Sequence, residues 1–374
     1  MMRRLVALAA LLALALSVWL GRELYRPYRG YSGSVLLEIE PGSRAPAVAR
    51  LLVERGVLAQ RLPFLVRYWL GRPRQSLKAG EYLFERPARP VDVYRRLVQG
   101  DVYLHPVVIP EGSDRFDMAR IFDERLQLDP AQFLRVTEQA SLVHDLDPEA
   151  PSLEGFLFPD TYRFAKGATA ATVVSTMLAR LRQVLASRFR TEPPLSSARL
   201  HAALTLASLV EKETPDPSER PVIAGVFVRR LARGMPLQCD PTVIYAARIN
   251  HRPLSSITTK DLDFDSPYNT YRRAGLPPGP IASPGEASIR AALYPEEGAA
   301  LYFVSNNRGG HVFARTLAEH LRNVARYRKG VAALGREGPE KVKRSRLPQR
   351  SAAQSAAAPA AKDAKHAEQE ADHP

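Results

Sequence analysis

The segment RLHAALTLASLVEKET, residues 199–214, predicts the clearest helix of the chain. Side chains three or four residues apart share one face of a helix. One apolar row on this helix ends in a carboxyl group: Leu200, Leu204, Ala207 and Glu211. If the row is buried, Glu211 is withdrawn from water, and a carboxyl withdrawn from water favours its protonated form. The protonated form is the one that can act as a general acid.

A second glutamate, Glu213, lies at the opposite margin of the same helix, and helix geometry alone does not choose between the two. A purely structural interpretation is that both side chains reach solvent or pair with Lys212 or Arg220. Evidence for a catalytic site therefore has to come from other segments of the chain.

Three other segments carry groups that suit a sugar ligand. Residues 153–162 are rich in aromatic side chains, residues 238–242 form a turn into another helix, and residues 264–286 form a long loop. Long loops in compact domains are usually functional. Amides, hydroxyls and tyrosine rings hydrogen-bond sugar hydroxyls and stack on sugar rings. The candidate substrate contacts are Glu154, Asp160, Tyr162, Asp240, Thr242, Tyr268 and Asn269. For Asp240, we also expect a role as N-cap of the following helix.

The N-terminus predicts export. Arg3 and Arg4 precede an apolar run from Leu5 to Leu20, about long enough to cross a bilayer. The run continues past a weak cleavage signal at residues 15–17, which favours an uncleaved anchor over a signal peptide. We therefore predict a cytoplasmic stub and a single-pass transmembrane anchor at residues 1–22, with the rest of the chain exported.

The remaining chain predicts an α+β protein with two folded parts. A compact α+β module is expected at residues 34–100 and a larger mixed α+β domain at residues 101–330. The elements expected in the module are strands at 35–39 and 80–84 and helices at 47–55, 62–70 and 91–98. Beyond it, we expect a strand at 107–110, helices near 115–124, 130–138, 170–187 and 218–233, a hairpin within 301–313 and a helix at 316–328. Residues 335–374 are rich in Lys, Ala, Pro and Glu, cannot bury a core and are predicted to be disordered.

Composition excludes several classes of protein. The single cysteine, Cys239, rules out an intrachain disulfide and a multi-cysteine zinc site, and we expect neither a metal nor a cofactor. The formal net charge of +14 would suit an anionic partner. The chain has no helix-turn-helix, RNA-recognition or zinc-finger pattern, so we expect no nucleic acid partner.

Several segments resemble, in the same order, the YceG-like endolytic murein transglycosylases (MltG type). They are LEGFLFPDTY at 153–162, ASLVEKET at 207–214, DPTVIY at 240–245, YNTY at 268–271, GLPPGPI at 275–281 and LYFV at 301–304. The resemblance extends from the apolar N-terminal run to about residue 325. It implies that Glu211 is the catalytic glutamate and that residues 34–100 form a LysM-like module. Cys239 departs from the pattern, which has a threonine there.

The resemblance also implies a reaction. The family cleaves the bond between N-acetylmuramic acid and N-acetylglucosamine within nascent peptidoglycan strands, leaves a 1,6-anhydro end and so terminates elongation. One carboxyl can serve this reaction, because the attacking 6-hydroxyl belongs to the same sugar. The expected setting is the cell inner membrane with the catalytic domain in the periplasm, where the anchor keeps the enzyme near peptidoglycan synthases.

Three alternatives remain at this point. A hydrolase on the same substrate would use Glu211 and Asp240 as a pair. A non-enzymatic scaffold would bind peptidoglycan through residues 34–100. A Ser/His hydrolase has histidines available, but the chain has no Gly-x-Ser-x-Gly elbow.

Overall fold

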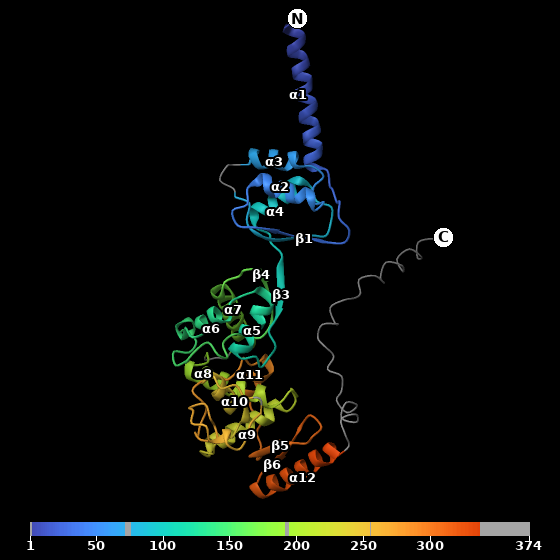
Figure 1. The fold of residues 1–374 in the computed structure, drawn as a ribbon. Coiled ribbons are helices and arrows are strands. Elements are labelled where there is room, and N and C mark those ends of the chain that lie inside the picture. Colours follow the sequence, from blue (N-terminus) through green and yellow to red (C-terminus); the bar gives the residue numbers. More distant parts are fainter. Residues whose placement is uncertain (1, 72–75, 191–193, 255, 337–374) are drawn as a thin grey trace, which may run out of the picture. The chain divides into compact units, whose positions relative to one another are not determined.

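The computed structural model describes residues 2–71, 76–190, 194–254 and 256–336 (Figure 1). The chain divides into two compact units at Leu301 and Tyr302. The regular elements of the described residues are helices and two-stranded antiparallel sheets, so the predicted mixed α+β class is confirmed. The predicted tail lies outside the described residues from position 337 onward.

Helix α1, Met2–Tyr25, contains the apolar N-terminal run. It is the one helix of the described chain that is long and apolar enough to cross a membrane, and none of its residues is buried. An apolar surface that no protein covers is favourable in lipid and costly in water. The helix is therefore consistent with a membrane anchor.

The predicted module follows as strand, two helices, strand and helix. Its elements are β1 (Val35–Ile39), α2 (Ala45–Glu54), α3 (Arg61–Leu70), β2 (Gly80–Phe84) and α4 (Pro90–Gln99). Strands β1 and β2 pair antiparallel with Leu37 opposite Tyr82. Both side chains are buried in a core that also contains Leu52, Phe64 and Leu97. Both predicted strands are confirmed, and each helix boundary lies within two residues of its expected place.

The next segment builds a second core around another antiparallel pair. Its elements are β3 (Leu104–Val108), α5 (Arg115–Leu126), α6 (Pro130–Thr137), a short 3-10 helix (Ala140–Val143), β4 (Thr161–Ala165) and α7 (Ala170–Arg188). Val107 of β3 lies opposite Tyr162 of β4. Strand β4 was not predicted, because its partner lies more than fifty residues earlier in the chain. Burial alternates along β4, and its Phe164 contacts Phe122 of α5.

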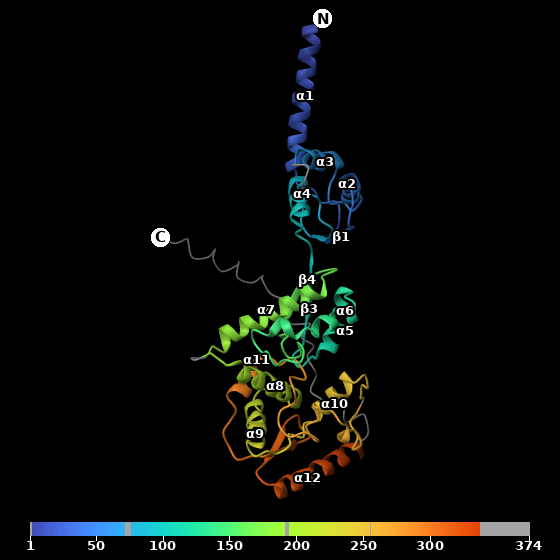
Figure 2. The same cartoon turned by 90° about the vertical axis from the view of Figure 1, so that its left-hand side faces the viewer.

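Helix α8, Ser197–Glu213, is the most deeply packed helix near the candidate site. It is capped by Ser196, whose side chain accepts the N–H of Arg199. After it come α9 (Arg220–Ala232), α10 (Asp240–Ile249), a 3-10 turn (Asp261–Asp263) and α11 (Glu286–Leu293). Helix α11 was not predicted, and it packs against α8 and α9 (Figure 2). The expected start of α9 at Ser218 is two residues early, and its N-cap is Glu219.

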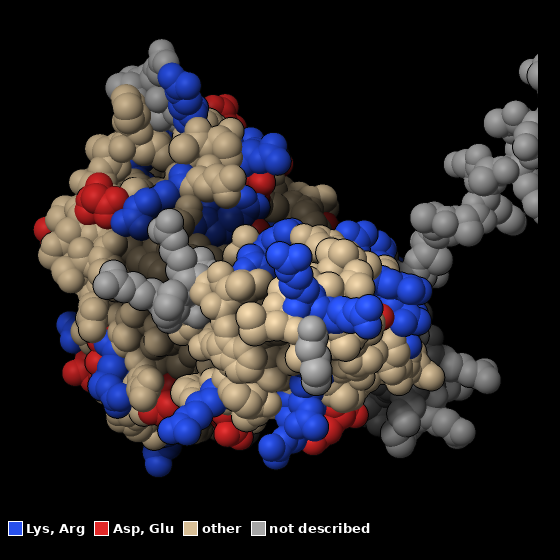
Figure 3. Space-filling view, turned by 90° about the horizontal axis from the view of Figure 1, so that it is seen from above, with Lys and Arg blue, Asp and Glu red and all other residues tan. Residues whose placement is uncertain are grey.

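The second unit contains the predicted hairpin, β5 (Tyr302–Ser305) paired with β6 (His311–Ala314), and helix α12 (Leu317–Arg336), which packs on both strands. Asn307 occupies the left-handed region in the connecting turn, a conformation that asparagine tolerates better than most residues. Figure 3 shows one face of the molecule, on which Lys and Arg side chains are more prominent than Asp and Glu side chains.

Candidate active site

Helix α8 places the predicted carboxyl in a dry environment. Leu200, Leu204 and Ala207 are buried, as the apolar row requires. The Ser208 hydroxyl accepts the N–H of Ile281 at 3.0 Å and so joins the helix to the long loop. The side chain of Glu211 is 5% exposed, one turn further along. The glutamate therefore does not extend into open solvent.

Two donors hold the Glu211 carboxylate. Arg220 Nη2 lies 2.8 Å from Glu211 Oε1, and the backbone N–H of Gly285 donates to Oε2 at 2.9 Å. The Arg220 side chain is itself buried, at the first turn of α9. Charge-assisted hydrogen bonds of this kind are short and fix the orientation of the carboxyl group. The purely structural interpretation had allowed an ion pair between Glu211 and Arg220. This ion pair is present, but both of its side chains are buried.

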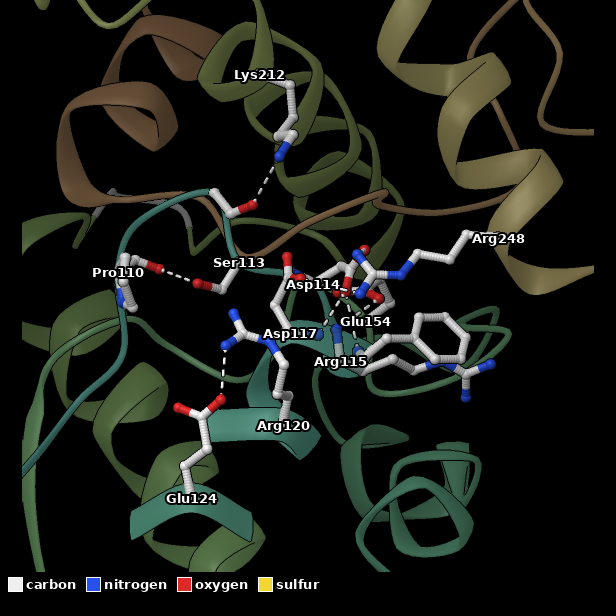
Figure 4. A network of polar contacts seen from close by, with 12 residues as sticks. Pro110, Ser113, Asp114, Arg115, Asp117, Arg120, Glu124, Glu154, Lys212 and Arg248 are labelled. Carbon is white, nitrogen blue, oxygen red and sulfur yellow. Dashed lines mark hydrogen bonds and ion pairs between the residues drawn. The ribbon is translucent and has the colours of Figure 1, made fainter. Parts of the chain in front are cut away.

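The turn after β3 also contributes to the site, although it comes much earlier in the sequence than α8. The N–H of Gly112 donates to the carbonyl of Ser283, and the N–H of Ser283 donates to the carbonyl of Ser113, both at 2.9 Å. Lys212 Nζ donates to the carbonyl of Gly112 at 3.1 Å (Figure 4). These bonds bring Glu111 to within 3.6 Å of Arg220, measured from Oε2 to Nη1.

Sequence reasoning gave no role to Glu111. Its side chain is half exposed, and burial together with the negative charge of Glu211 raises its pKa from the usual value of 4.5. Its carboxyl rests against Gly285, where a Cβ atom would come within 1.9 Å of Oε1. A glutamate and a glycine in a turn directly after a strand were the only signal in the sequence.

The structure separates the two glutamates that helix geometry could not. Glu213 lies near Cys239, where burial and the Glu213 carboxylate raise the pKa of the thiol. Glu211 alone lies between Arg220 and Gly285.

Glu154 belongs to a buried polar network at the start of α5. It is 2% exposed, and its Oε2 accepts the N–H of Arg115 at 3.1 Å. Burial, and then the charge of Asp114, raise the pKa of Glu154 to about 8. Arg248 reaches the same network through Asp114 at 2.6 Å and Asp117 at 2.9 Å (Figure 4). In this position Glu154 stabilises the start of α5, and its contact with a substrate stays a prediction.

Two other candidates are engaged in the fold around β4. The Tyr162 hydroxyl donates to the carbonyl of Phe158 at 2.6 Å, and its ring lies in the core. Asp160 Oδ2 accepts from Arg180 Nε at 2.6 Å. Among the described residues, neither side chain contacts Glu211, Arg220 or Gly285, so their role toward a glycan also stays a prediction.

The last four candidates organise the long loop. Thr242 Oγ1 lies 2.9 Å from Thr270 Oγ1, and Asn269 Nδ2 donates to two loop carbonyls, at 2.9 and 2.7 Å. Tyr268 is buried edge-on against Tyr245. These bonds order a segment with little regular secondary structure.

The expected N-cap at Asp240 is wrong. Cys239 is the N-cap of α10 and makes no side-chain cap bond, while Asp240 is the first helical residue. Its carboxylate instead accepts the hydroxyl of Tyr271. Substrate contact by these loop residues stays a prediction.

Comparison with known proteins identifies the fold's relatives. The sequence model of the YceG-like family matches residues 37–326. The chain belongs to the YceG-like family. An endolytic murein transglycosylase of Bacillus subtilis is 30% identical, over 82% of this chain and 89% of that protein. One of Streptococcus pneumoniae serotype 2 is 29% identical, over 78% of this chain and 58% of that protein. The crystal structure of a yceG-like protein from Listeria monocytogenes aligns with a TM-score of 0.50 and 31% identity, covering 78% of this chain and 99% of that one. The resemblance drawn from the motifs is confirmed.

Proposed function

We propose that this YceG-like protein is an endolytic murein transglycosylase, a lyase that cleaves the bond between N-acetylmuramic acid and N-acetylglucosamine within nascent peptidoglycan strands and so ends their elongation. Relatives that carry this name are about 30% identical over most of the chain. The observation that supports the chemistry is the buried Glu211 carboxyl, held between Arg220 and the N–H of Gly285.

In this proposal Glu211 acts twice. As the acid, it gives a proton to the glycosidic oxygen, and the bond to the anomeric carbon breaks. As the carboxylate, it takes the proton of the muramyl 6-hydroxyl, which attacks the same anomeric carbon and closes the 1,6-anhydro ring. The attacking group is already part of the substrate, so the reaction gains the advantage of an intramolecular step and consumes no water. Arg220 and Gly285 contact one carboxyl oxygen each, so they fix the orientation of the Glu211 side chain for both roles.

The remaining parts of the chain fit this task. Helix α1 would be a single-pass anchor in the inner membrane, residues 34–100 a LysM-like module that binds glycan, and residues 101–330 the periplasmic catalytic domain. The β–α–α–β order of the module supports this assignment. Anchoring would keep the site close to newly made strands and to the synthases that extend them.

The test is the full-length chain in detergent with purified peptidoglycan, followed by mass spectrometry of the released muropeptides. The parent protein should yield anhydro ends, whereas reducing ends would identify a hydrolase instead. Glu211→Gln should lower the rate by roughly a hundred- to ten-thousand-fold, because it removes a general acid and base. Glu213→Gln is the matched control on the same helix and should keep activity. Near-parental cleavage by Glu211→Gln would remove Glu211 from the mechanism.

A further inference from the structure

Helix α3 of the module carries apolar side chains on its exposed face. Leu62, Trp69 and Leu70 are 46%, 62% and 75% exposed. They share one side of the helix with the partly exposed Val66, because residues four, seven and eight positions apart lie on one helical face. The buried Phe64 belongs to the opposite face and packs in the core of the module. Helix α3 is therefore apolar on both sides.

The exposed face of α3 differs from the scattered apolar side chains of an ordinary surface. Among the described residues of the module, the other exposed large apolar side chain is Leu36 of β1, at 41%. Figures 1 and 2 show α3 and β1 on opposite sides of the module. Single exposed apolar side chains are normal, whereas a contiguous apolar face marks an interaction surface.

The module is joined closely to helix α1. Two residues separate the end of α1 at Tyr25 from Tyr28, which exchanges two backbone hydrogen bonds with Ala88, both 3.0 Å long. The N–H of Gly30 donates to the carbonyl of Gly56 at 2.8 Å. The segment that follows α1 is therefore held against the module.

Burial along α1 shows which part of this helix meets the module. Residues 2–18 are exposed, whereas Trp19, Leu20 and Leu24 are partly buried, and α1 contacts α3 and α4. The last turns of α1 therefore make these contacts. The apolar run begins at Leu5, and roughly 20 residues are needed to cross the hydrocarbon core, which reaches Leu24. If α1 spans a bilayer, α3 lies at the surface of that bilayer.

We propose that the exposed face of α3, formed by Leu62, Val66, Trp69 and Leu70, inserts into the lipid surface beside the anchor and seats the module on the membrane. The inference rests on the anchor assigned to α1 in the proposed function. Helices with an exposed apolar face lie at the boundary between headgroups and acyl chains, and tryptophan is enriched there. The seated module would meet glycan strands close to the membrane.

The charges near this face suit a lipid surface. Arg22 and Arg26 lie at the end of α1, Arg61 is the first residue of α3, and all three are exposed. Helix α3 has no acidic residue, and Glu23 of α1 pairs with Arg26 at 3.4 Å. The surplus of arginines favours anionic headgroups next to the inserted apolar side chains.

The experiment uses the two tryptophans of the chain, Trp19 and Trp69. The full-length Trp19→Phe variant is placed in nanodiscs of phosphatidylethanolamine and phosphatidylglycerol, so that Trp69 alone is observed. We expect strong quenching of Trp69 by lipids brominated on their acyl chains near the headgroup, and little quenching by acrylamide in the water. Its emission should also lie at shorter wavelength than in the unfolded chain. Quenching by acrylamide without quenching by brominated lipids would overturn the proposal, because the α3 face would then be open to water.

Trp69→Phe leaves Trp19 as the reporter of the anchor. Quenching of Trp19 but not of Trp69 by brominated lipids rejects the seating of α3 and keeps the anchor. A lack of quenching at both positions rejects the anchor and the seating together. Release of anhydro-muropeptides by the same nanodiscs tests the transglycosylase separately from either outcome.

A matched pair of variants tests the face itself, each made together with Trp19→Phe. Leu62→Gln combined with Leu70→Gln should weaken the quenching of Trp69 by brominated lipids and increase its quenching by acrylamide. Leu36→Gln changes an exposed leucine of β1 and should leave both measurements unchanged. The urea midpoint should stay the same in each variant, because all three leucines are exposed. Equal lipid quenching in the two variants would show that the α3 leucines do not enter the membrane and would refute the proposal.

Discussion

The buried carboxyl of Glu154 makes the stability of the folded chain depend on pH in a direction opposite to that of most glutamates. Its pKa is raised from 4.5 to about 8 by burial and by the charge of Asp114. The folded protein therefore holds this proton more tightly than the unfolded chain. The contribution of Glu154 to the free energy of unfolding is fully present below pH 4.5 and is lost as the pH rises through 8.

The size of the effect follows from the difference between the pKa of Glu154 in the folded protein and its pKa in the unfolded chain. Each pH unit corresponds to about 1.4 kcal/mol, so the folded state should lose up to about 5 kcal/mol between pH 4 and pH 9. Glu154→Gln cannot ionise, and its amide oxygen can still accept the N–H of Arg115. Between pH 4 and pH 9, the free energy of unfolding of this variant should therefore fall by up to about 5 kcal/mol less than that of the parent.

Pulse proteolysis in urea, at several pH values, measures the free energy of unfolding of the full-length chain in detergent. Glu138→Gln is the matched control, because Glu138 lies 3.7 Å from Arg115 but its side chain is 64% exposed. The free energy of unfolding of this control should change with pH as that of the parent does. If the parent and Glu154→Gln change in parallel between pH 4 and pH 9, Glu154 is not the buried neutral acid described above.

Two other predictions concern the packing beneath the long loop. Gly155 has a φ of +80°, and a Cβ atom added there would lie 2.3 Å from Pro280. Gly155→Ala should therefore lower the free energy of unfolding, measured in urea, by about 1–3 kcal/mol. An unchanged urea midpoint would show that the loop does not pack tightly against this turn. Cys239 is 1% exposed, and burial and the charge of Glu213 raise the pKa of its thiol. Iodoacetamide should therefore label Cys239 at pH 8 only after denaturation. Rapid labelling of the native protein would contradict its burial.

Local patterns were sufficient for much of the fold. Strands β1 and β2 and the helices of the module follow from alternation, helical spacing and the prolines and glycines at their ends, all of which act over a few residues. The apolar run of α1 and the apolar row that ends in Glu211 have the same local character. Local patterns therefore identified the α+β class, the module and a helix with two candidate glutamates, while the choice of Glu211 came from the resemblance of longer motifs to the YceG-like family.

Elements that depend on distant partners were missed. Strand β4 is five residues long and owes its conformation to β3, and the short α11 is stabilised by packing on α8 and α9. No local pattern marks either one, because its free energy comes from contacts with residues far along the chain.

The surroundings of Glu211 were decided by the tertiary structure alone. Glu111 precedes it by a hundred residues, while Arg220 and Gly285 follow it, and the folded chain brings all three to one carboxyl group. Spacing along a helix could show that Glu211 ends an apolar row, but not whether water, a cation or another acid would meet it there. The ionisation of a carboxyl depends on charges and donors within a few ångströms, and those distances exist only once the chain has folded.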